Sequence, residues 1–353
     1  MEIEVGKLIK KTKVKRCEDG NYPILSMTMH DGLVFQNDRF KKQIASIDQS
    51  NYQVVKRHQL VESFPIDEGV LAVQELTDEG IVSPAYKIWD IDMDKIIPVY
   101  LEYALRAPRS IQYYKSKLRG TTARRRSITD DEFCSMRIQC PGLTRQVEII
   151  GIIDKAKSII DKRKRELEVI DDLIKARFVE MFGNGHDGIC NTKNLGEFCK
   201  FQQGTQVPVE EQIEEQLEGY TRFLRIIDYT QAPQLPRYVS VKGREIAEDS
   251  VVIVRYGATA GFVGHGYAGI LANNLFEVIP DESVLIKDFL YLSLKYGTFE
   301  QEVHDKAFGA AMPALSFGMM NDIKVVIPDM VAQKDFVNFV KQVDKSKFIE
   351  IYV

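Results

Sequence analysis

The sequence has few of the patterns that mark secreted, membrane or metal-binding proteins. Its 353 residues include five cysteines, and none of these forms a CxxC pair. The N-terminal segment MEIEVGKLIKK lacks the apolar core of a signal peptide, and no apolar run approaches the roughly 18 residues that span a membrane. We therefore expect a cytoplasmic protein with reduced thiols and no membrane partner. His186, Cys190 and Cys199 do not have the spacing of a zinc site, so we expect no metal.

Signatures of common enzyme classes are also missing. We find no GxSxG, no HExxH, no PD-(D/E)xK pattern and no NPPY or DPPY tetrapeptide. These motifs would mark serine hydrolases, zinc proteases, nucleases and amino-methyltransferases. We therefore predict no catalytic residues. The formal net charge is −4, so any positively charged surface for nucleic acid must be local.

Length and composition are those of a globular protein with two domains. The chain is 44% hydrophobic and 28% charged, which is ordinary for a soluble fold. At this length it can bury more than one apolar core.

One segment, Thr144–Phe182, is predicted to form a single long helix. It contains no proline and one glycine, and apolar residues recur at alternating steps of four and three from Ile149 to Met181. This is the heptad pattern of a coiled coil. Arg163 and Arg177 fall on the predicted seam, where they can fix register. The narrow apolar stripe favours a partner helix; packing on the core of its own domain is the alternative.

The segments on either side of this helix resemble each other. Four blocks recur in the same order, which indicates a tandem repeat of one mixed α/β (α+β) domain. The matched blocks are Tyr22–Gly32 with Tyr220–Gln231, Phe64–Val73 with Ile246–Gly257, Ile96–Tyr114 with Leu285–Val303, and Pro141–Gln146 with Pro328–Gln333. The third pair is predicted to be an amphipathic helix in each half. The predicted organisation is a domain at 1–143, a helix at 144–183, a second domain at 184–328 and a shorter helix at 329–353.

A glycine-rich loop, RYGATAGFVGHG at Arg255–Gly266, follows the apolar run Ser250–Val254. A phosphate-binding loop would need either a GK pair or a helix directly after the glycines. This loop has no lysine, and it leads into Gly269–Pro280, an apolar run that looks like a strand. We therefore predict a β-hairpin loop whose backbone closely approaches another surface.

A basic cluster lies between Tyr103 and Thr129. It carries eight arginines and lysines and no acidic residue, with Tyr113 and Tyr114 among them. A solvated helix face followed by a basic loop would explain the cluster, but contact with phosphates is the stronger interpretation. Arginine is also suited to bidentate contacts with guanine in the major groove.

Taken together, these features resemble the specificity subunit (S, or HsdS) of type I restriction–modification systems. The segment KAKSIIDKRKRELEVIDDLIKARFVEMFG is similar to the central helix of that family, and SVVIVRYGATAG is similar to a turn of its target-recognition domains. The series of Gly, Leu-Ser, Ile-Pro and Gln near the end of each domain is similar to the same pattern. The resemblance covers essentially the whole chain.

This resemblance implies a non-catalytic protein that reads double-stranded DNA. Each target-recognition domain would read one half of a bipartite site, and the two helices would pack as an antiparallel coiled coil that sets the spacer. The helices would also dock two methyltransferase (M) subunits, and restriction (R) subunits can join. S-adenosylmethionine, ATP and Mg²⁺ would belong to those partners, so no cofactor is expected here. The alternatives are a catalytic nuclease or methyltransferase subunit with an unrecognised site, and a protein-binding scaffold.

By the same resemblance, the basic and glycine-rich segments would contact DNA. Lysines would position the protein on phosphates, while Arg, Gln and Thr side chains can read base edges. The predicted DNA-contacting residues are Arg109, Lys115, Lys117, Arg119, Thr121, Thr122, Arg124, Arg125, Arg126, Gln202, Gln203, Thr205, Arg255, Tyr256, Thr259, His265 and Lys306.

The second helix departs from the family pattern because it is shorter than the first. We expect this to leave Ile170, Ile174, Phe178 and Met181 without partners in the same chain. An M subunit or a second copy of the chain would then cover them.

Overall fold

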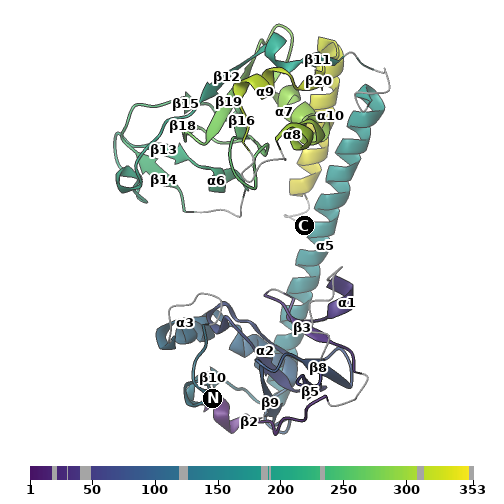
Figure 1. Ribbon diagram of the computed structural model, residues 1–353, viewed down its shortest axis with the longest axis vertical. Helices are drawn as coiled ribbons and strands as arrows, with labels where there is room; N and C mark the ends of the chain where they lie inside the picture. The colour runs from purple at the N-terminus through teal and green to yellow at the C-terminus, as the bar shows by residue number, and fades with distance from the viewer. Residues whose placement is uncertain are drawn as a thin grey trace. The chain divides into compact units, whose positions relative to one another are not determined.

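The computed structural model describes residues 1–17, 22–29, 31–39, 49–118, 126–183, 190, 192–230, 235–307 and 314–349, with backbone only for 39, 306–307 and 344–349. Internal contacts divide the chain into a first unit, Met1–Asp161, and a second unit, Lys162–Val353 (Figure 1). Each unit is described by itself. The boundary falls within one helix, α5 (Leu143–Phe182), which confirms the long helix predicted from the heptads.

The first unit is built on a four-stranded antiparallel sheet in the order β2-β9-β6-β7. Three antiparallel pairs accompany it among the described residues: β1 with β10, β3 with β4, and β5 with β8. The strands are β1 (Glu2–Glu4), β2 (Ile9–Lys11), β3 (Leu25–Met27), β4 (Leu33–Phe35), β5 (Gln53–Lys56), β6 (Leu60–Glu62), β7 (Leu71–Val73), β8 (Glu79–Val82), β9 (Lys87–Ile91) and β10 (Arg137–Gln139). The helices are η1 (Val5–Lys7), α1 (Gln36–Arg39), η2 (Ile66–Glu68), α2 (Pro98–Leu105), α3 (Pro108–Lys117), α4 (Asp130–Ser135) and the first part of α5.

The second unit holds two four-stranded sheets, β12-β19-β16-β17 and β14-β13-β18-β15, and the pair β11·β20. The first sheet is antiparallel, whereas β13 and β18 in the other run parallel. The strands are β11 (Thr192–Asn194), β12 (Cys199–Gln203), β13 (Thr221–Leu224), β14 (Arg237–Val239), β15 (Glu245–Ile246), β16 (Val251–Val254), β17 (Val263–Gly264), β18 (Gly269–Leu271), β19 (Leu275–Pro280) and β20 (Lys324–Val326). The helices are η4 (Leu195–Glu197), η5 (Val209–Glu211), α6 (Ile226–Thr230), α7 (Lys287–Tyr296), α8 (Phe299–Ala307), α9 (Phe317–Asn321), α10 (Met330–Ile349) and the last part of α5.

The two units repeat one pattern of strand pairing, which confirms the tandem repeat. The sheet β2-β9-β6-β7 corresponds to β12-β19-β16-β17, and β1·β10 corresponds to β11·β20. The remaining strands also correspond. β3 pairs with β4, and Ile24 just before β3 forms a parallel bridge with Ile81 of β8. In the same way, β13 pairs with β14 and lies parallel to β18. One predicted match is wrong by one strand. The block Phe64–Val73, which contains β7, was matched to the segment that contains β16, but β6 is the strand that pairs with β9 as β16 pairs with β19. The apolar pattern alone does not distinguish successive strands of a hairpin.

The repeated Pro-to-Gln spacing has a structural reason. Gln146 and Gln333 are both fully buried near the start of α5 and α10. The Gln146 side chain accepts from Ile97 N and donates to the carbonyl oxygens of Lys95 and Pro141, at 2.8, 3.1 and 2.8 Å. In the second unit the Gln333 side chain does the same with Ile286 N, Val284 O and Pro328 O, at 3.0, 2.9 and 2.9 Å. Each glutamine therefore ties its helix to the turn before α2 or α7.

We expect Gln333→Met to destabilise the second unit by about 1–3 kcal/mol. The substitution keeps side-chain length but leaves buried backbone groups without partners, and each such group costs on this order. Chemical denaturation followed by far-UV circular dichroism would measure the change. Gln342→Met, at an exposed position of the same helix, is the matched control. Equal effects of the two substitutions would contradict the role given to Gln333.

The predicted amphipathic helices are each two helices. In the first unit α2 ends at Leu105 and α3 begins at Pro108, because proline favours the first turn of a helix and cannot lie in its interior. In the second unit α7 ends at Tyr296, and a Cβ added at the next residue, Gly297, would lie 2.5 Å from the Ser293 carbonyl oxygen. The single helices predicted for these blocks were therefore wrong.

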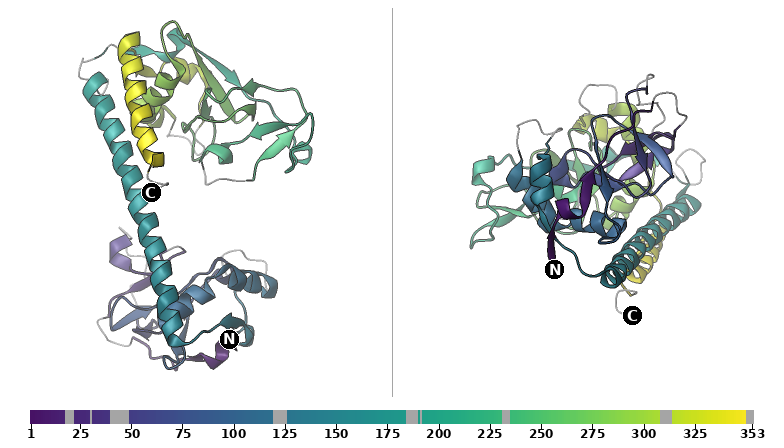
Figure 2. Two further views of the ribbon diagram at one scale, coloured as in Figure 1. Left: turned by 180° about the vertical axis from the view of Figure 1, so that it is seen from behind. Right: turned by 90° about the horizontal axis from the view of Figure 1, so that it is seen from below.

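Within the second unit, α10 lies antiparallel beside the end of α5 (Figures 1 and 2). Phe178 and Phe182 of α5 pack against Phe336 of α10, with ring centroids 5.4 and 5.5 Å apart. Phe289 of α7 joins them, 5.2 Å from Phe182. These rings belong to the main apolar core of the unit.

This packing corrects two predictions. Ile174 and Phe178 are 1% exposed, and Ile170 and Met181 pack against the same core, so these residues do have partners in the chain. The buried stripe passes through Phe178 and not through Arg177, which is half-exposed and pairs with Glu180. Steps of four near the end of α5 turn the apolar face toward α7 as well as α10, which a strict heptad does not anticipate.

Candidate nucleic-acid interface

Three predicted contact residues of the second unit meet at the turn between β18 and β19. Gln203 Nε2 donates to Asn273 O at 2.9 Å, and Arg255 N donates to Asn274 O at 2.9 Å. Thr205 N donates to Leu271 O at 2.6 Å. The run Gly269–Pro280, expected as one strand, is thus two strands, and the turn between them joins the segment after β12 to the loop after β16. We call Gln203, Thr205, Asn273, Arg255 and Tyr256 the rim.

The Arg255 side chain is held among aromatic rings. Its guanidinium lies 4.8 Å from the Tyr256 ring centroid and 5.8 Å from that of Phe317, and its Nε donates to Leu315 O at 3.2 Å. Phe317 stacks in turn on Phe201 of β12, at 6.0 Å and 21°. Tyr256 remains 38% exposed. An arginine and an exposed ring fixed side by side can contact both a phosphate and a base.

The glycine-rich loop is a hairpin connection, as predicted. β16 and β17 pair antiparallel, and Val254 N donates to Phe262 O across the turn. A Cβ on Gly261 would lie 2.7 Å from Val303 Cγ1 of α8, and the residue has φ +91°. Only glycine fits both that close approach and that backbone conformation. Thr259 at the tip is exposed.

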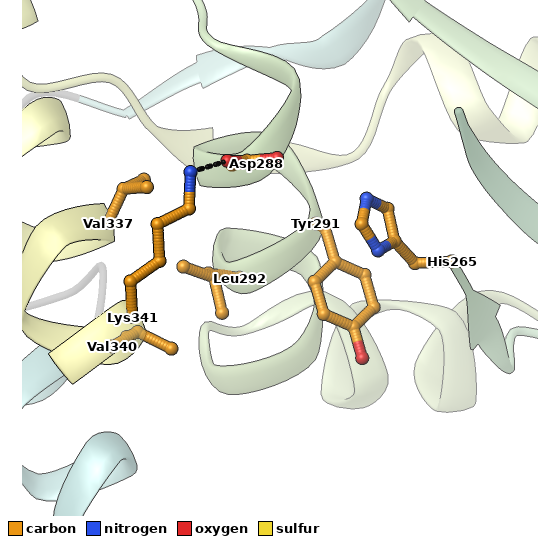
Figure 3. A pocket seen from close by; sticks show the side chains of 7 residues that line it. All are labelled: His265, Asp288, Tyr291, Leu292, Val337, Val340 and Lys341. Atoms are coloured by element: carbon orange, nitrogen blue, oxygen red, sulfur yellow. Dashed lines mark ion pairs between the residues drawn. The ribbon is translucent and has the colours of Figure 1, made fainter. Parts of the chain in front are cut away.

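His265, the next predicted contact, faces a different surface. Its ring stacks on Tyr291 of α7 at 4.8 Å and 24°. Together these rings form one end of a pocket of about 150 Å³ (Figure 3). Leu292, Val337 and Val340 line its apolar part, and the Lys341–Asp288 ion pair, at 2.6 Å, lies at the other end. The structure therefore places the His265 ring against α7, and its role in DNA contact stays a prediction. Lys306 lies in α8, and its side chain is outside the described atoms.

In the first unit, several predicted residues make ion pairs within the protein. Arg109 bonds to Glu2 at 2.7 Å, and this hydrogen bond holds the pKa of Glu2 below its usual value. Arg126 bridges Asp67 and Glu68 of η2 at 2.9 and 2.8 Å. Lys115 and Lys117 are exposed on α3. The predicted contacts Arg119, Thr121, Thr122, Arg124 and Arg125 lie outside the described residues.

Equivalent positions beneath α4 and α9 carry opposite chemistry. The pair Ile9–Ile91 in β2 and β9 corresponds to the pair Cys199–Pro280 in β12 and β19. Counting along the strands from these pairs, Lys11 corresponds to Phe201, and Lys87 corresponds to Phe276. Asp130 and Phe317 correspond because each follows the N-cap of its helix, Thr129 or Ser316. In the first unit Lys11 and Lys87 both pair with Asp130. In the second unit the three phenylalanines pack together instead, with ring centroids 5.5–6.1 Å apart.

Below the ionic group lies a buried carboxylate. Glu62 is 2% exposed and bonds to Lys87 Nζ at 2.9 Å and to Trp89 Nε1 at 3.1 Å. Burial raises the pKa of Glu62, while the Lys87 ammonium opposes that shift. The carboxylate is enclosed by the sheet and α4, which favours a structural role.

Two groups of residues were missed by the sequence argument. Asn273 of the rim and its neighbour Asn274 accept hydrogen bonds from Gln203 and Arg255, and nothing in the apolar run around them distinguished a turn from a strand. The segment Lys10–Arg16, KKTKVKR, carries five cations in seven residues and follows the path of the segment after β12. Its density of positive charge could have marked it as a candidate for phosphate contact. Its correspondence to the segment after β12 is visible only from the matching registers of β2 against β9 and β12 against β19.

Within the described parts of the chain, no group of His, Cys, Asp or Glu could hold a metal ion. No helix there is both long and apolar enough to cross a membrane.

Comparison with known proteins gives a family match for most of the second unit. Residues 190–351 match the family described as type I restriction modification DNA specificity domain. The type I restriction enzyme MjaVIII specificity subunit of Methanocaldococcus jannaschii is 24% identical over 178 residues, which are 48% of this chain and 41% of that protein. Residues 190–351 of this chain therefore match a type I DNA specificity domain.

Solved structures place both units in the fold of the specificity subunits. The S subunit of the type I system from M. genitalium aligns with a TM-score of 0.51 and 14% identity, over 98% of this chain and 90% of that one. A chain from a structure on complex assembly and conformational transition of the type I R-M system aligns with a TM-score of 0.53 and 16% identity, over 98% and 90%. These alignments show the same fold for this chain, with two tandem mixed α/β units and a long helix between them.

Proposed function

We propose that this chain is the non-catalytic DNA-recognition subunit of a type I restriction–modification complex. Each unit reads one half of a bipartite double-stranded site. The α5 and α10 helices set the spacer and dock two methyltransferase subunits, and restriction subunits can join the complex. S-adenosylmethionine, ATP and Mg²⁺ are bound by those partners, and the complex works in the cytoplasm.

The observation that carries this proposal is the match of residues 190–351 to a DNA specificity domain, together with the repetition of its strand pairing in the first unit. The rim adds support, because it gathers amide, hydroxyl, guanidinium and aromatic groups at one end of a sheet. These are the groups that read base edges and stack on bases. The matched segment is less than half the length of the M. jannaschii relative. The partners and the DNA substrate of this chain are therefore proposed from the chemistry of the rim together with the family match.

Genomic methylation tests the proposal directly. Strains with and without the gene would be compared by sequencing modified bases. We expect a bipartite motif to be methylated only when this chain and its neighbouring methyltransferase are both present. An unchanged methylation pattern after deletion would contradict the proposal, and so would methyltransferase or nuclease activity of the chain alone.

Arg255→Ala should weaken specific binding by about 1–3 kcal/mol, or roughly 5- to 150-fold in Kd, if Arg255 contacts a base edge. The measurement is the affinity of the purified complex for duplexes that carry the methylated motif or single-base changes in it. Discrimination should relax at one position of one half-site. Arg177→Ala on α5, where the arginine is also partly exposed and ion-paired, is the control. Unchanged affinity and discrimination would remove Arg255 from the interface.

A further inference from the structure

The segment Lys10–Arg16 is fixed by the backbone across two sheets of the first unit. Lys11 pairs with Trp89 in the β2–β9 ladder, and Thr12 N donates to Ile88 O at 3.0 Å. Further on, Val54 N donates to Lys15 O at 2.8 Å, and Arg16 forms a bridge with Gln53 of β5. The cations are therefore carried on an ordered backbone.

Among the described residues, one of these five cations, Lys11, forms an ion pair with an acidic side chain. Lys10 lies opposite Asp90 in the ladder, Lys11 pairs with Asp130, and Arg16 bonds to Asn51 at 3.1 Å. The Lys13 and Lys15 side chains have neither an ion pair nor a hydrogen bond with any described residue, and both residues are exposed. Two uncompensated charges two residues apart favour an external anion.

The tandem repeat relates this segment to the rim. β2 and β12 have the same register against β9 and β19, so the residues that follow them leave the same edge of the sheet. In the second unit that segment is Gln202–Gln206, which contributes Gln203 and Thr205 to the rim and carries no charge. In the first unit the corresponding stretch is dominated by lysine.

We propose that Lys13 and Lys15 contact the phosphate backbone of duplex DNA, and that this segment of the first unit anchors DNA by charge where the corresponding segment of the second unit contacts it through amide and hydroxyl groups. This inference rests on the proposed function. It assigns to the first unit a second contact segment besides the predicted Arg109–Arg126 cluster. The two half-sites would then differ in how strongly salt weakens their binding.

The test is the salt dependence of DNA binding by the full-length chain. Each phosphate contact contributes about 0.9 to the slope of log K against log salt concentration. We expect Lys13→Ala with Lys15→Ala to reduce that slope by about 2, and Lys13→Arg with Lys15→Arg to keep it. Lys155→Ala with Lys164→Ala, at exposed positions of α5, removes the same charge elsewhere.

Each outcome separates the two ideas. A wild-type chain that shows no salt-dependent binding to duplex DNA would contradict the proposed function itself. Wild-type binding with equal slopes for the Lys13/Lys15 and Lys155/Lys164 alanine variants would overturn this inference and leave the function standing. Circular dichroism checks that both variants remain folded. Both substitutions are exposed, so a shared loss of structure would also argue against an exposed contact segment.

Discussion

Phe178→Ala should destabilise the second unit by about 3–5 kcal/mol, the usual cost of removing a buried aromatic side chain. Phe178 is 1% exposed, and its ring lies 5.1, 5.4 and 6.3 Å from those of Phe182, Phe336 and Phe289. The cavity would open where α5, α7 and α10 meet. Rigid rings on three helices cannot easily collapse into it.

The chain's single tryptophan makes this result specific. Trp89 is buried in the first unit, so its fluorescence reports that unit, whereas far-UV circular dichroism reports both. In denaturant, Phe178→Ala should move the dichroism transition of the second unit and leave the fluorescence midpoint in place. The neighbouring Val179→Ala, at a 39% exposed position, should change neither. A fluorescence midpoint that moves equally would show that Phe178 does not act through the second unit.

Lys87→Met should destabilise the first unit by about 3 kcal/mol near neutral pH. Removing the lysine leaves the Glu62 carboxylate buried without its ion-pair partner, and breaking a buried pair typically costs about 3–5 kcal/mol. The lower value is expected because Lys87 is 28% exposed. The Trp89 fluorescence midpoint in denaturant measures the loss. Lys95→Met, which removes the exposed pair with Asp92, should cost less than about 1 kcal/mol.

The pH dependence of this loss has a definite sign. Burial raises the pKa of Glu62 above that of the unfolded chain, and removal of Lys87 raises it further. A raised carboxyl pKa lowers stability as pH increases from the unfolded value through the folded one. The deficit of Lys87→Met should therefore be largest at neutral pH and shrink as acid protonates Glu62. A deficit that does not change with pH would place the cost in lost packing.

Much of the fold was accessible from the sequence because its signals are periodic or repeated. The heptad pattern predicted α5 to within one residue, and the repeated Pro-to-Gln spacing was one of the four blocks that indicated the tandem repeat. The break at Ala107–Pro108 could have been anticipated from proline chemistry. Phe178 was excluded from the predicted seam because a heptad assumes one partner helix, while this residue packs against two.

The interface was less accessible because it depends on contacts between distant segments. Gln203 and Arg255 are far apart in sequence and meet through the turn at Asn273 and Asn274. No local pattern encodes that meeting. Lys13 and Lys15 were visible as charge, but only the shared register of β2 and β12 relates them to the rim.

The exchange of an ionic group for an aromatic one beneath α4 and α9 gives the two halves different responses to temperature. Apolar contacts weaken on cooling, so the Phe201–Phe276–Phe317 contact should hold α9 less firmly in the cold. The cost of desolvating charges falls on heating, so the Lys11–Asp130–Lys87 group should lose less as temperature rises. One backbone plan, present twice in this chain, thus holds its two corresponding helices by contacts of different chemistry, whose strengths change with temperature for different physical reasons.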